Sequence, residues 1–510
     1  MNAIVQYIKS LENPATGTSP TFDTLVIGLM LVVIAIVVIQ AWRKGVRNLS
    51  SLGDPKTKPG LWAWIAVILL WTVVMLNYFD RQLLSVVRVP IVQDIPMTDA
   101  QFGLITSAFL VIYAVLSPVG GFLADRYSRR IVILGSLVVW STVTWWTGHA
   151  RDYETLFIAR AAMGISEAFY IPAALALITD YHRGSTRSLA TGIHMSGIYA
   201  GMALAGFGAT MSDAIGWRMT FALFGLVGVI YGFVLIVFLR EPGAAPADNA
   251  REEKLRDEKR AAAEAAAAAE KNGVPAEASS EAVPAAAEEK SAAPAADFEK
   301  LSGAQVFKSL LSCRPMWILL TVVAFAGAGN WFLLTWYPTL LHDTFNLTPG
   351  QAGPQATLWS SIAKYVSVIV CAIIADRWVQ RNLRARALVP GISFAIAGPC
   401  VVIAVVLAGL FGGVSWLLYA MLALVATQGI AQGALDATLM PVMRSHIDER
   451  YSATGYGLLN FTSAGVGALI SFFGGWFKDL GVPLTTTLAV AGALMFICGV
   501  LFFLLPKPAK

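Results

Sequence analysis

Long apolar runs separated by short polar segments occupy most of the 510-residue chain. A membrane-crossing helix needs roughly 20 mostly apolar residues, because it rises about 1.5 Å per residue through a hydrocarbon core about 30 Å thick. The runs are too long and too uniformly apolar for the alternating strands of a barrel, so they predict helices. The predicted spans are 22–42, 62–87, 101–124, 131–148, 155–178, 190–212, 219–239, 315–341, 353–375, 387–410, 414–440, 452–476 and 484–505.

The order of the spans predicts two bundles. We expect an all-α membrane protein with twelve helices in two six-helix bundles, preceded by one extra N-terminal transmembrane helix. The segment between the bundles is rich in Ala, Glu, Pro and Ser, and it cannot bury enough apolar area to fold, so we interpret it as a low-complexity linker. The predicted domains are 1–60 for the extra helix and a basic linker, 61–240 for the first bundle, 241–314 for the central linker and 315–510 for the second bundle.

Composition and charge placement agree with a membrane protein. Hydrophobic residues make up 56% of the chain and charged residues 14%, whereas soluble domains carry about 25% charged residues. Lys and Arg are concentrated in alternate loops, which the positive-inside rule assigns to the cytoplasm, so the net charge of +5 is no sign of nucleic-acid binding. We therefore expect a monomeric, multi-pass protein of the inner membrane in contact with the lipid bilayer, with a cytoplasmic C-terminus and linker and a periplasmic N-terminus.

No sequence feature points to an enzyme, a cofactor or a metal. The four cysteines, Cys313, Cys371, Cys400 and Cys498, show no paired spacing and lie in or beside apolar spans, so we expect reduced packing residues. We find no Ser/His/Asp set, metal-ligand spacing or phosphate-binding loop. Basic residues follow the first apolar run, which is the pattern of a membrane anchor and not of a cleaved signal peptide.

Two short matches relate the halves of the chain to each other. The stretches GGFLADRYSRR and IIADRWVQR each end a span, and they set Asp125 and Asp376 251 residues apart. Further along, RSLATG matches RYSATG with an offset of 263 residues. Two matches in the same order predict a six-plus-six duplication, and such halves usually enclose a site near the bilayer midplane where they meet.

The same motifs resemble a known family. GFLADRYSRR is similar to the loop signature of the major facilitator superfamily, and RAAMG, which begins at Arg160, resembles the fourth-helix motif of that superfamily. The run Gly197, Gly201 and Gly206 resembles its fifth-helix motif, although the spacing is four and then five residues. The resemblance covers about 60–505, and it implies a twelve-helix transporter to which the span 22–42 is an addition.

Two branches of the superfamily match best. NYFDRQLLS and FLLTWYPTLL resemble the anion:cation symporters, which move organic anions such as sugar acids with protons. NYFDR and GISEAFYIPAA also resemble Spinster-type transporters, which carry lysolipids and sphingolipid phosphates. Because FLLTWYPTLL favours the first branch, we predict proton-coupled symport of a small anionic solute such as a hexuronate, an aldonate or sialic acid by alternating access. A Spinster-like lipid transporter is the alternative, and a receptor or sensor that lost transport is a third class.

Ionisable residues within the first bundle are candidates for coupling, because charges inside a membrane are costly and mark functional sites. Arg160 and Glu167 are seven residues apart and share a helix face, which can meet Asp80 and Arg81. Desolvation favours a protonated carboxyl and a neighbouring guanidinium favours the charged form, so such a group can take up and release a proton. We expect Asp80 and Glu167 to be proton sites, with sodium not excluded, and Arg81 and Arg160 to modulate them or contact substrate. The alternative is a neutralised structural ion network.

The second bundle offers a different set of candidates. Lys364 corresponds to Tyr113 through the 251-residue offset, and both would face a central cavity. An ammonium at the midplane binds an anionic substrate or pairs with a carboxylate, for which Asp436 is the candidate. The 263-residue offset assigns no titratable pair to this half. The candidates for hydrogen bonding and ring stacking to a solute are Asn330, Trp331, Gln428, Gln432 and Asn460.

The basic loop motifs predict a gate. They lie at helix ends on the expected cytoplasmic side, where ion pairs could hold the halves together while the site faces outward. Opening toward the cytoplasm would break these contacts. The expected gate residues are Asp125, Arg126, Arg129, Arg130, Asp376 and Arg377.

Overall fold

The computed structural model describes residues 24, 26–33, 35–36, 60–182, 186–240, 303–411, 414–447 and 452–507, without the side chains of 118, 121–122, 125–126, 187–188, 303–307, 415 and 452–454. These residues form helices and contain no β-strand. The helices are α3 (Leu61–Val86), α4 (Arg88–Asp94), α5 (Asp99–Arg126), α6 (Arg129–Thr147), α7 (Tyr153–Glu167), α8 (Tyr170–Tyr181), α9 (Arg187–Ile215), α10 (Trp217–Phe238), α12 (Gly303–Ser312), α13 (Arg314–Phe345), α14 (Pro349–Val379), α15 (Ala385–Phe411), α16 (Ser415–Arg444), α17 (Ser452–Asp479) and α18 (Leu484–Phe503).

The described residues contain 11 helical segments long and apolar enough to cross a membrane, with α7 and α8 counted as one segment. α9 is not among them, although it is 29 residues long. Its glycines, serines and His194 lower its hydropathy, yet it packs tightly between α3 of its own bundle and α14 of the other. The expected all-helical membrane fold is therefore confirmed, and α9 takes the place of the predicted span 190–212.

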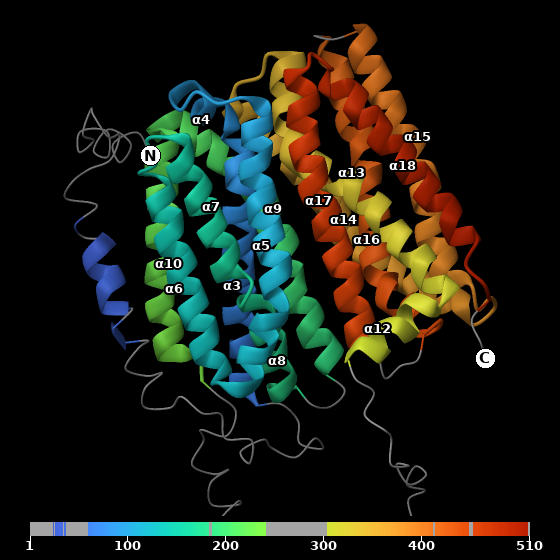
Figure 1. Ribbon diagram of the computed structural model, residues 1–510, viewed down its shortest axis with the longest axis horizontal. Helices are drawn as coiled ribbons and strands as arrows, with labels where there is room; N and C mark the ends of the chain where they lie inside the picture. The colour runs from blue at the N-terminus through green and yellow to red at the C-terminus, as the bar shows by residue number, and fades with distance from the viewer. Residues whose placement is uncertain are drawn as a thin grey trace, which may run out of the picture.

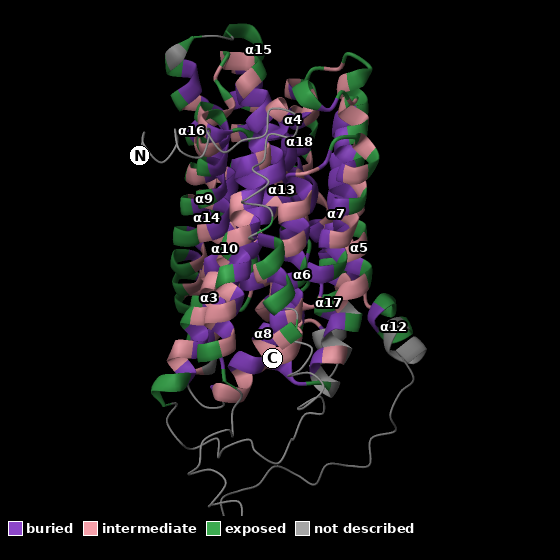
Figure 2. Ribbon diagram, turned by 90° about the vertical axis from the view of Figure 1, so that its left-hand side faces the viewer, coloured by how far each residue is buried: buried purple, intermediate pink, exposed green. Residues whose placement is uncertain are grey.

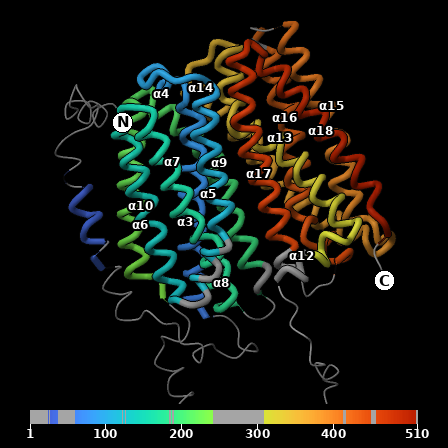
Figure 3. Tube along the Cα trace, viewed as in Figure 1, coloured from blue at the N-terminus to red at the C-terminus, as the bar shows by residue number. Residues whose placement is uncertain are grey.

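The helices form two bundles that stand side by side. α3 to α10 build one bundle and α13 to α18 build the other, as the change from blue-green to yellow-red shows in Figure 1 and along the chain trace in Figure 3. Across the boundary α5 packs on α17 and α9 packs on α14. Buried residues concentrate along the inner faces of the helices and exposed residues follow the outer edges (Figure 2). This arrangement leaves the boundary between the bundles as the place where a central site can form.

The halves are tied together at the end that carries α4, at the top of Figure 1. The Asp479 carboxylate at the end of α17 accepts hydrogen bonds from the backbone N–H groups of Asp99 and Ala100, each at 2.8 Å. The Lys478 ammonium lies 3.4 Å from the Asp99 carboxylate. A Cβ atom at Gly475 would collide with the Asp99 backbone, so the absence of a side chain allows this close approach. Hydrogen bonds, an ion pair and close packing therefore join the start of α5 to the end of α17 at this end of the molecule.

The helix that carries Glu167 is interrupted. α7 ends at Glu167 and α8 begins at Tyr170, within the single predicted span 155–178. Pro172 has no N–H to donate to the carbonyl of the preceding turn, which opens the helix at this point. Next to the interruption, the Ser166 carbonyl accepts a hydrogen bond from the Ser136 hydroxyl of α6 at 2.5 Å. The interruption therefore has its own support from a neighbouring helix.

Two helical segments lie outside the two bundles. The described part of the predicted extra span is helical, and Val26, Met30 and Val33 pack against Val138 of α6 and Val229 of α10. This part of the chain lies outside the first bundle and not between the halves. The short helix α12 falls within the predicted linker 241–314, whose remainder up to 302 lies outside the described residues.

Candidate functional site

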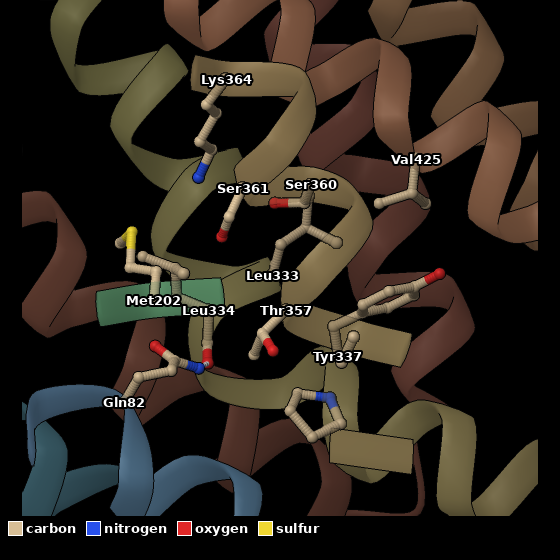
Figure 4. Close-up of a pocket in the computed structure, with 12 residues that line it drawn as sticks. Gln82, Met202, Leu333, Leu334, Tyr337, Thr357, Ser360, Ser361, Lys364 and Val425 are labelled. Carbon is tan, nitrogen blue, oxygen red and sulfur yellow. Dashed lines mark hydrogen bonds between the residues drawn. The ribbon is translucent and has the colours of Figure 1, made fainter. Parts of the chain in front are cut away.

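Two adjoining pockets lie between the bundles. One lies toward the first bundle and contains Arg81 and Arg160. The other lies toward the second bundle and contains Lys364 (Figure 4). We call them the arginine pocket and the lysine pocket. Gln82, Met202 and Leu334 line both pockets, so the two spaces meet at these side chains.

Gln82 bridges the two halves where the pockets meet. Its side-chain amide on α3 donates a hydrogen bond to the Leu334 carbonyl on α13 at 2.6 Å. In Figure 4 this amide reaches toward Leu334 beneath the lysine pocket. Gln82 is therefore both a wall of each pocket and a direct link between the bundles.

The arginine pocket is built around an ion pair at the helix interruption. Arg81 Nε donates to Glu167 Oε2 at 2.5 Å, and the side chains of Arg81 and Glu167 are only 9% and 0% exposed. The guanidinium of Arg81 also lies over the rings of Tyr113 at 4.3 Å and Tyr78 at 4.6 Å. One terminal nitrogen of Arg81 and one oxygen of Glu167 have no hydrogen-bond partner among the described residues. The pair therefore keeps unused hydrogen-bonding capacity beside the pocket.

Asp80 and Arg160 complete the predicted cluster, but they do not pair with each other. Asp80 is buried and accepts a hydrogen bond from the Thr144 hydroxyl of α6 at 3.2 Å. Arg160 donates to the Arg81 carbonyl at 2.9 Å and to the Met163 sulfur at 2.8 Å, and its guanidinium lies over the Phe109 ring at 5.0 Å. The structure thus gathers two carboxylates and two guanidiniums in one region, with a single direct ion pair.

The lysine pocket holds its charge among neutral partners. Lys364 Nζ donates to Asn330 Oδ1 at 2.7 Å, and the Gln428 side-chain amide lies 3.5 Å from the same oxygen. Lys364 is 2% exposed, and in Figure 4 its ammonium points from α14 into the pocket toward Ser361. The alternative partner Asp436 is bound elsewhere, because it accepts hydrogen bonds from Tyr199 at 2.7 Å and from Gln432 at 2.9 Å.

The other predicted substrate residues divide into those near the pockets and those away from them. Trp331 lines the arginine pocket, whereas Tyr113 does not line it and contacts Arg81 through its ring. Gln432 is occupied with Asp436, and Asn460 is exposed on α17 and lines neither pocket. The sequence pattern placed Asn460 on a helix at the boundary but could not fix the face on which it lies.

Three of the expected gate residues, Arg129, Arg130 and Asp376, make contacts within their own halves. Arg129 pairs with Asp180 at 2.5 Å, and Arg130 donates to the Ile236 carbonyl at 2.5 Å, all within the first bundle. Asp376 pairs with Arg386 at 2.9 Å within the second bundle. The side chains of Asp125 and Arg126 lie outside the described residues, and no pairing of Arg377 is recorded among the described ones. Among the ion pairs of the described residues, the pair that joins the two bundles lies at the opposite end, between Lys478 and Asp99.

Sequence reasoning missed several residues of the site. Gln82 directly follows the predicted pair Asp80 and Arg81, but a neutral amide within a span gave no charge signal. The contact of Thr144 with Asp80 could not be predicted either, because hydroxyl side chains occur widely in membrane helices. The sequence did contain a signal for the interrupted helix, because Pro172 stands within an apolar run.

The fold and the site together define a class of protein. Two helical bundles enclose buried cations and carboxylates at their boundary, and a broken helix carries one of those carboxylates. This is the architecture of a secondary transporter, in which a central site is formed by discontinuous helices between repeats.

Comparison with known proteins gives the family. The family model described as Major Facilitator Superfamily matches residues 70–408, so the chain belongs to that superfamily of membrane transporters. The D-galactonate transporter of Escherichia coli O6:H1 is 24% identical over 327 residues, which cover 64% of this chain and 70% of that protein. Protein spinster homolog 3 of Danio rerio is 33% identical over 192 residues, which cover 37% of this chain and 38% of that protein.

A solved structure has the same fold. The crystal structure of a bacterial homolog of the human lysosomal transporter Spinster, in an inward-facing and unoccupied conformation, superimposes with a TM-score of 0.67. It covers 88% of this chain and 97% of its own, at 18% sequence identity. The likeness extends over both bundles and supports the major facilitator fold.

Proposed function

We propose that this chain is a proton-coupled symporter of a small organic anion, with sugar acids as the substrate class. The observation that carries the proposal is the buried ion pair between Arg81 and Glu167, which lies at a helix interruption and beside the central arginine pocket. A carboxylate in this position can exchange a proton, and the guanidinium beside it can bind an anion. Both partners of the coupled reaction therefore meet at one pair of side chains.

The chemistry of coupling follows from competition for Arg81. While Glu167 is charged, it occupies the guanidinium of Arg81 at 2.5 Å. Protonation of Glu167 removes that competing charge, so an anionic substrate gains a cation with which to pair. Release of substrate restores the ion pair and favours loss of the proton. Asp80, held by Thr144 on the same side of the bundle, is the second proton site in this proposal.

Alternating access requires the two ends of the molecule to close in turn. The end that carries α4 is closed by Asp479, Lys478 and the backbone of Asp99. At the opposite end, Arg129 and Asp376 make contacts within their own halves. We propose that the basic end faces the cytoplasm in an inner membrane, that this arrangement is the inward-facing one, and that the basic loops exchange partners across the boundary in the outward-facing one.

The choice of substrate class rests on the pocket linings and on one relative. Hydroxyl groups of Ser85 and Thr106 line the arginine pocket, and those of Ser360 and Ser361 line the lysine pocket. Such groups suit a polyhydroxylated solute, and Asn330 and Gln428 orient the ammonium that would meet its acid group. The similarity to a D-galactonate transporter points to the same class.

The test is uptake into proteoliposomes under an imposed pH gradient, with sodium-free and sodium-containing arms. Wild-type protein should accumulate galactonate or a hexuronate when the outside is acidic. The Glu167→Gln variant should lose gradient-driven accumulation by about tenfold or more while keeping exchange of labelled for unlabelled substrate. Gradient-driven accumulation by Glu167→Gln equal to that of wild type would contradict the coupling role.

A Spinster-like lipid transporter is the second candidate. It is favoured by the similarity to protein spinster homolog 3 and by the apolar residues Leu333, Pro338 and Val425 in the lysine pocket. The same proteoliposomes distinguish the two, because a lipid substrate would appear as transfer of lysophospholipid between leaflets. Lysolipid transfer without sugar-acid uptake would replace the first proposal by the second.

A further inference from the structure

Two helices of the second bundle that pack on the first bundle contain a proline. Pro338 stands inside α13, which packs on α3, and Pro354 stands inside α14, which packs on α9. Proline has no backbone N–H, so the carbonyl four residues before it loses its partner within the helix. In α13 that carbonyl belongs to Leu334, and in α14 it belongs to Gly350. Each helix therefore has one carbonyl that needs a donor from elsewhere in the structure.

Side chains of the first bundle bind both of these carbonyls. Gln82 on α3 donates its side-chain amide to the Leu334 carbonyl at 2.6 Å. Thr210 on α9 donates its hydroxyl to the Gly350 carbonyl at 2.8 Å. A backbone carbonyl freed by proline in a membrane helix is costly unless a neighbouring helix satisfies it. In both helices the proline provides the acceptor, and the opposite bundle provides the donor.

The two contacts lie on the side of the boundary that is closed. Gln82 and Thr210 each stand near the end of their helix that is closer to α4. The backbone N–H of Gly350 also donates to the Asp213 carboxylate of α9 at 2.8 Å. A Cβ atom at Gly350 would collide with the Thr210 backbone, so the absence of a side chain allows α9 and α14 to approach here.

The two contacts differ in burial. Gln82 is 6% exposed and lines both central pockets, and Figure 4 shows its amide beside Leu334. Thr210 is exposed. Water competes for a hydrogen bond at an exposed position and much less at a buried one. The contact of Gln82 should therefore contribute more to holding the bundles together.

We propose that Pro338 and Pro354 are positioning residues for alternating access, because each provides a carbonyl on which the first bundle docks while the end that carries α4 is closed. When the bundles separate at that end, each carbonyl must exchange its side-chain donor for water. The two prolines therefore set the balance between the closed and open forms of this end. This inference rests on the alternating access of the proposed function and adds the groups that control it.

The experiment measures hydrogen–deuterium exchange of the purified full-length protein in lipid nanodiscs. The reporter is the segment 98–103 at the start of α5, where the N–H groups of Asp99 and Ala100 bond to Asp479 across the boundary. Opening of this end exposes these N–H groups and speeds their exchange. The reference is the segment 224–234 of α10, which packs on α6 within the first bundle and responds to general loss of stability.

Two pairs of variants test the contacts. Gln82→Met keeps the length of the side chain and removes the donor, so exchange in the reporter should rise about fivefold, which corresponds to about 1 kcal/mol. Pro338→Ala gives the Leu334 carbonyl a donor within its own helix and should speed exchange in the same way. Adding Pro338→Ala to Gln82→Met should have no further effect, because the contact is already lost. Thr210→Val and Pro354→Ala should show the same relation with a rise of about twofold.

The chain offers a matched control for each kind of substitution. Pro399→Ala also restores an N–H inside a helix, but α15 packs on α14, α16 and α18 of its own bundle. Thr321→Val removes a hydroxyl that donates to the Trp317 carbonyl of its own helix. Neither control should change exchange in the reporter segment.

Three results would overturn the inference. One is unchanged reporter exchange in Gln82→Met, and another is a multiplied effect when Gln82→Met and Pro338→Ala are combined. The third is a rise in the reference segment as large as that in the reporter, which would mean general loss of stability. The exchange experiment contains no substrate, so the uptake test of the proposed function fails or succeeds independently of it.

Discussion

The two halves of this transporter share an architecture and differ in how they hold charge. Tyr113 on α5 and Lys364 on α14 correspond to each other through the 251-residue offset of the sequence repeat. In the first half the equivalent position is an aromatic ring, and the cation above it, Arg81, is neutralised by Glu167. In the second half the cation itself stands at that position and contacts the neutral Asn330. One half contains a buried ion pair, and the other a buried positive charge that donates to a neutral amide.

The fourth membrane span of each half shows the same contrast. In the first half it is interrupted between α7 and α8, and Glu167 lies fully buried at the interruption. In the second half α16 runs unbroken for 30 residues, and Ile430, the counterpart of Glu167 by the 263-residue offset, is 45% exposed. The two halves therefore keep the same helix arrangement while their charged groups differ, in line with the proposed division between proton coupling in the first half and substrate recognition in the second. The predictions below test that division, from the largest expected effect to the smallest.

Removing one partner of the ion pair should have the largest effect on stability. Arg81→Met leaves the buried Glu167 without its cation, and breaking a buried pair in this way costs about 3–5 kcal/mol of unfolding free energy. The double variant Arg81→Met/Glu167→Gln removes both charges and should recover most of that loss. The measurement is denaturant unfolding in detergent micelles for the wild type, the two single variants and the double variant.

A simple sum of the two single effects in the double variant would contradict the pairing. Coupled residues show an interaction energy in such a cycle, whereas independent residues more than about 7–10 Å apart add within about 0.5 kcal/mol. An additive result would also remove the contrast with the second half. The reason is that Glu167 and Arg81 would then contribute to stability independently, and neither half would contain a buried charge stabilised by an opposite charge.

The sequence predicted the arrangement of helices better than the details of the site. Apolar run length fixed the spans within a few residues, because the bilayer imposes that length on any sequence. The rarity of charges in membranes likewise drew attention to Asp80, Arg81, Arg160 and Glu167, which the structure brings into one region. Asn330 was also identified, as a side chain on the seventh span suited to hydrogen bonding.

What the sequence could not provide was the partner of each group. The choice of Asn330 over Asp436 by Lys364 depends on which helix faces approach each other, and sequence spacing within one helix carries no such information. The bridge from Gln82 to the Leu334 backbone joins residues 252 apart and uses neutral groups, so neither charge nor spacing could reveal it. The hydrogen bonds from the start of α5 to the Asp479 carboxylate were missed for the same reason.

In the second half, removing the partner of the buried Lys364 should lower the unfolding free energy by less than Arg81→Met does. Asn330→Ala removes the amide that accepts from Lys364, and a hydrogen bond to a charged group is worth about 1.5–3 kcal/mol. Unfolding in the same detergent gives the value, and Asn330→Asp is the informative companion because it converts the contact into an ion pair. A loss for Asn330→Ala as large as that for Arg81→Met would mean that both halves depend equally on one polar contact.

The helix interruption of the first half should be supported by a single hydroxyl. Ser136→Ala removes the hydrogen bond to the Ser166 carbonyl beside the interruption, and we expect a loss of about 1 kcal/mol, typical of a neutral hydrogen bond. The matched control is Ser393→Ala in α15, where the hydroxyl donates to a carbonyl of its own unbroken helix. Equal losses in the two variants would show that the interruption needs no special support.

The smallest effect should come from the ion pairs of the basic end, and here the halves can be compared directly. Arg386→Gln breaks a pair with Asp376 whose side chains are 40% and 68% exposed, so we expect at most about 0.5 kcal/mol, reduced further by salt. Arg129→Gln breaks the pair with Asp180 at 9% and 12% exposure and should cost more, because water screens it less. Unfolding measured at low and high salt distinguishes the two. A larger loss for Arg386→Gln than for Arg129→Gln would mean that the exposed pair does more than join the ends of α14 and α15. The proposed division between a coupling first half and a recognition second half would then need revision at this end of the molecule.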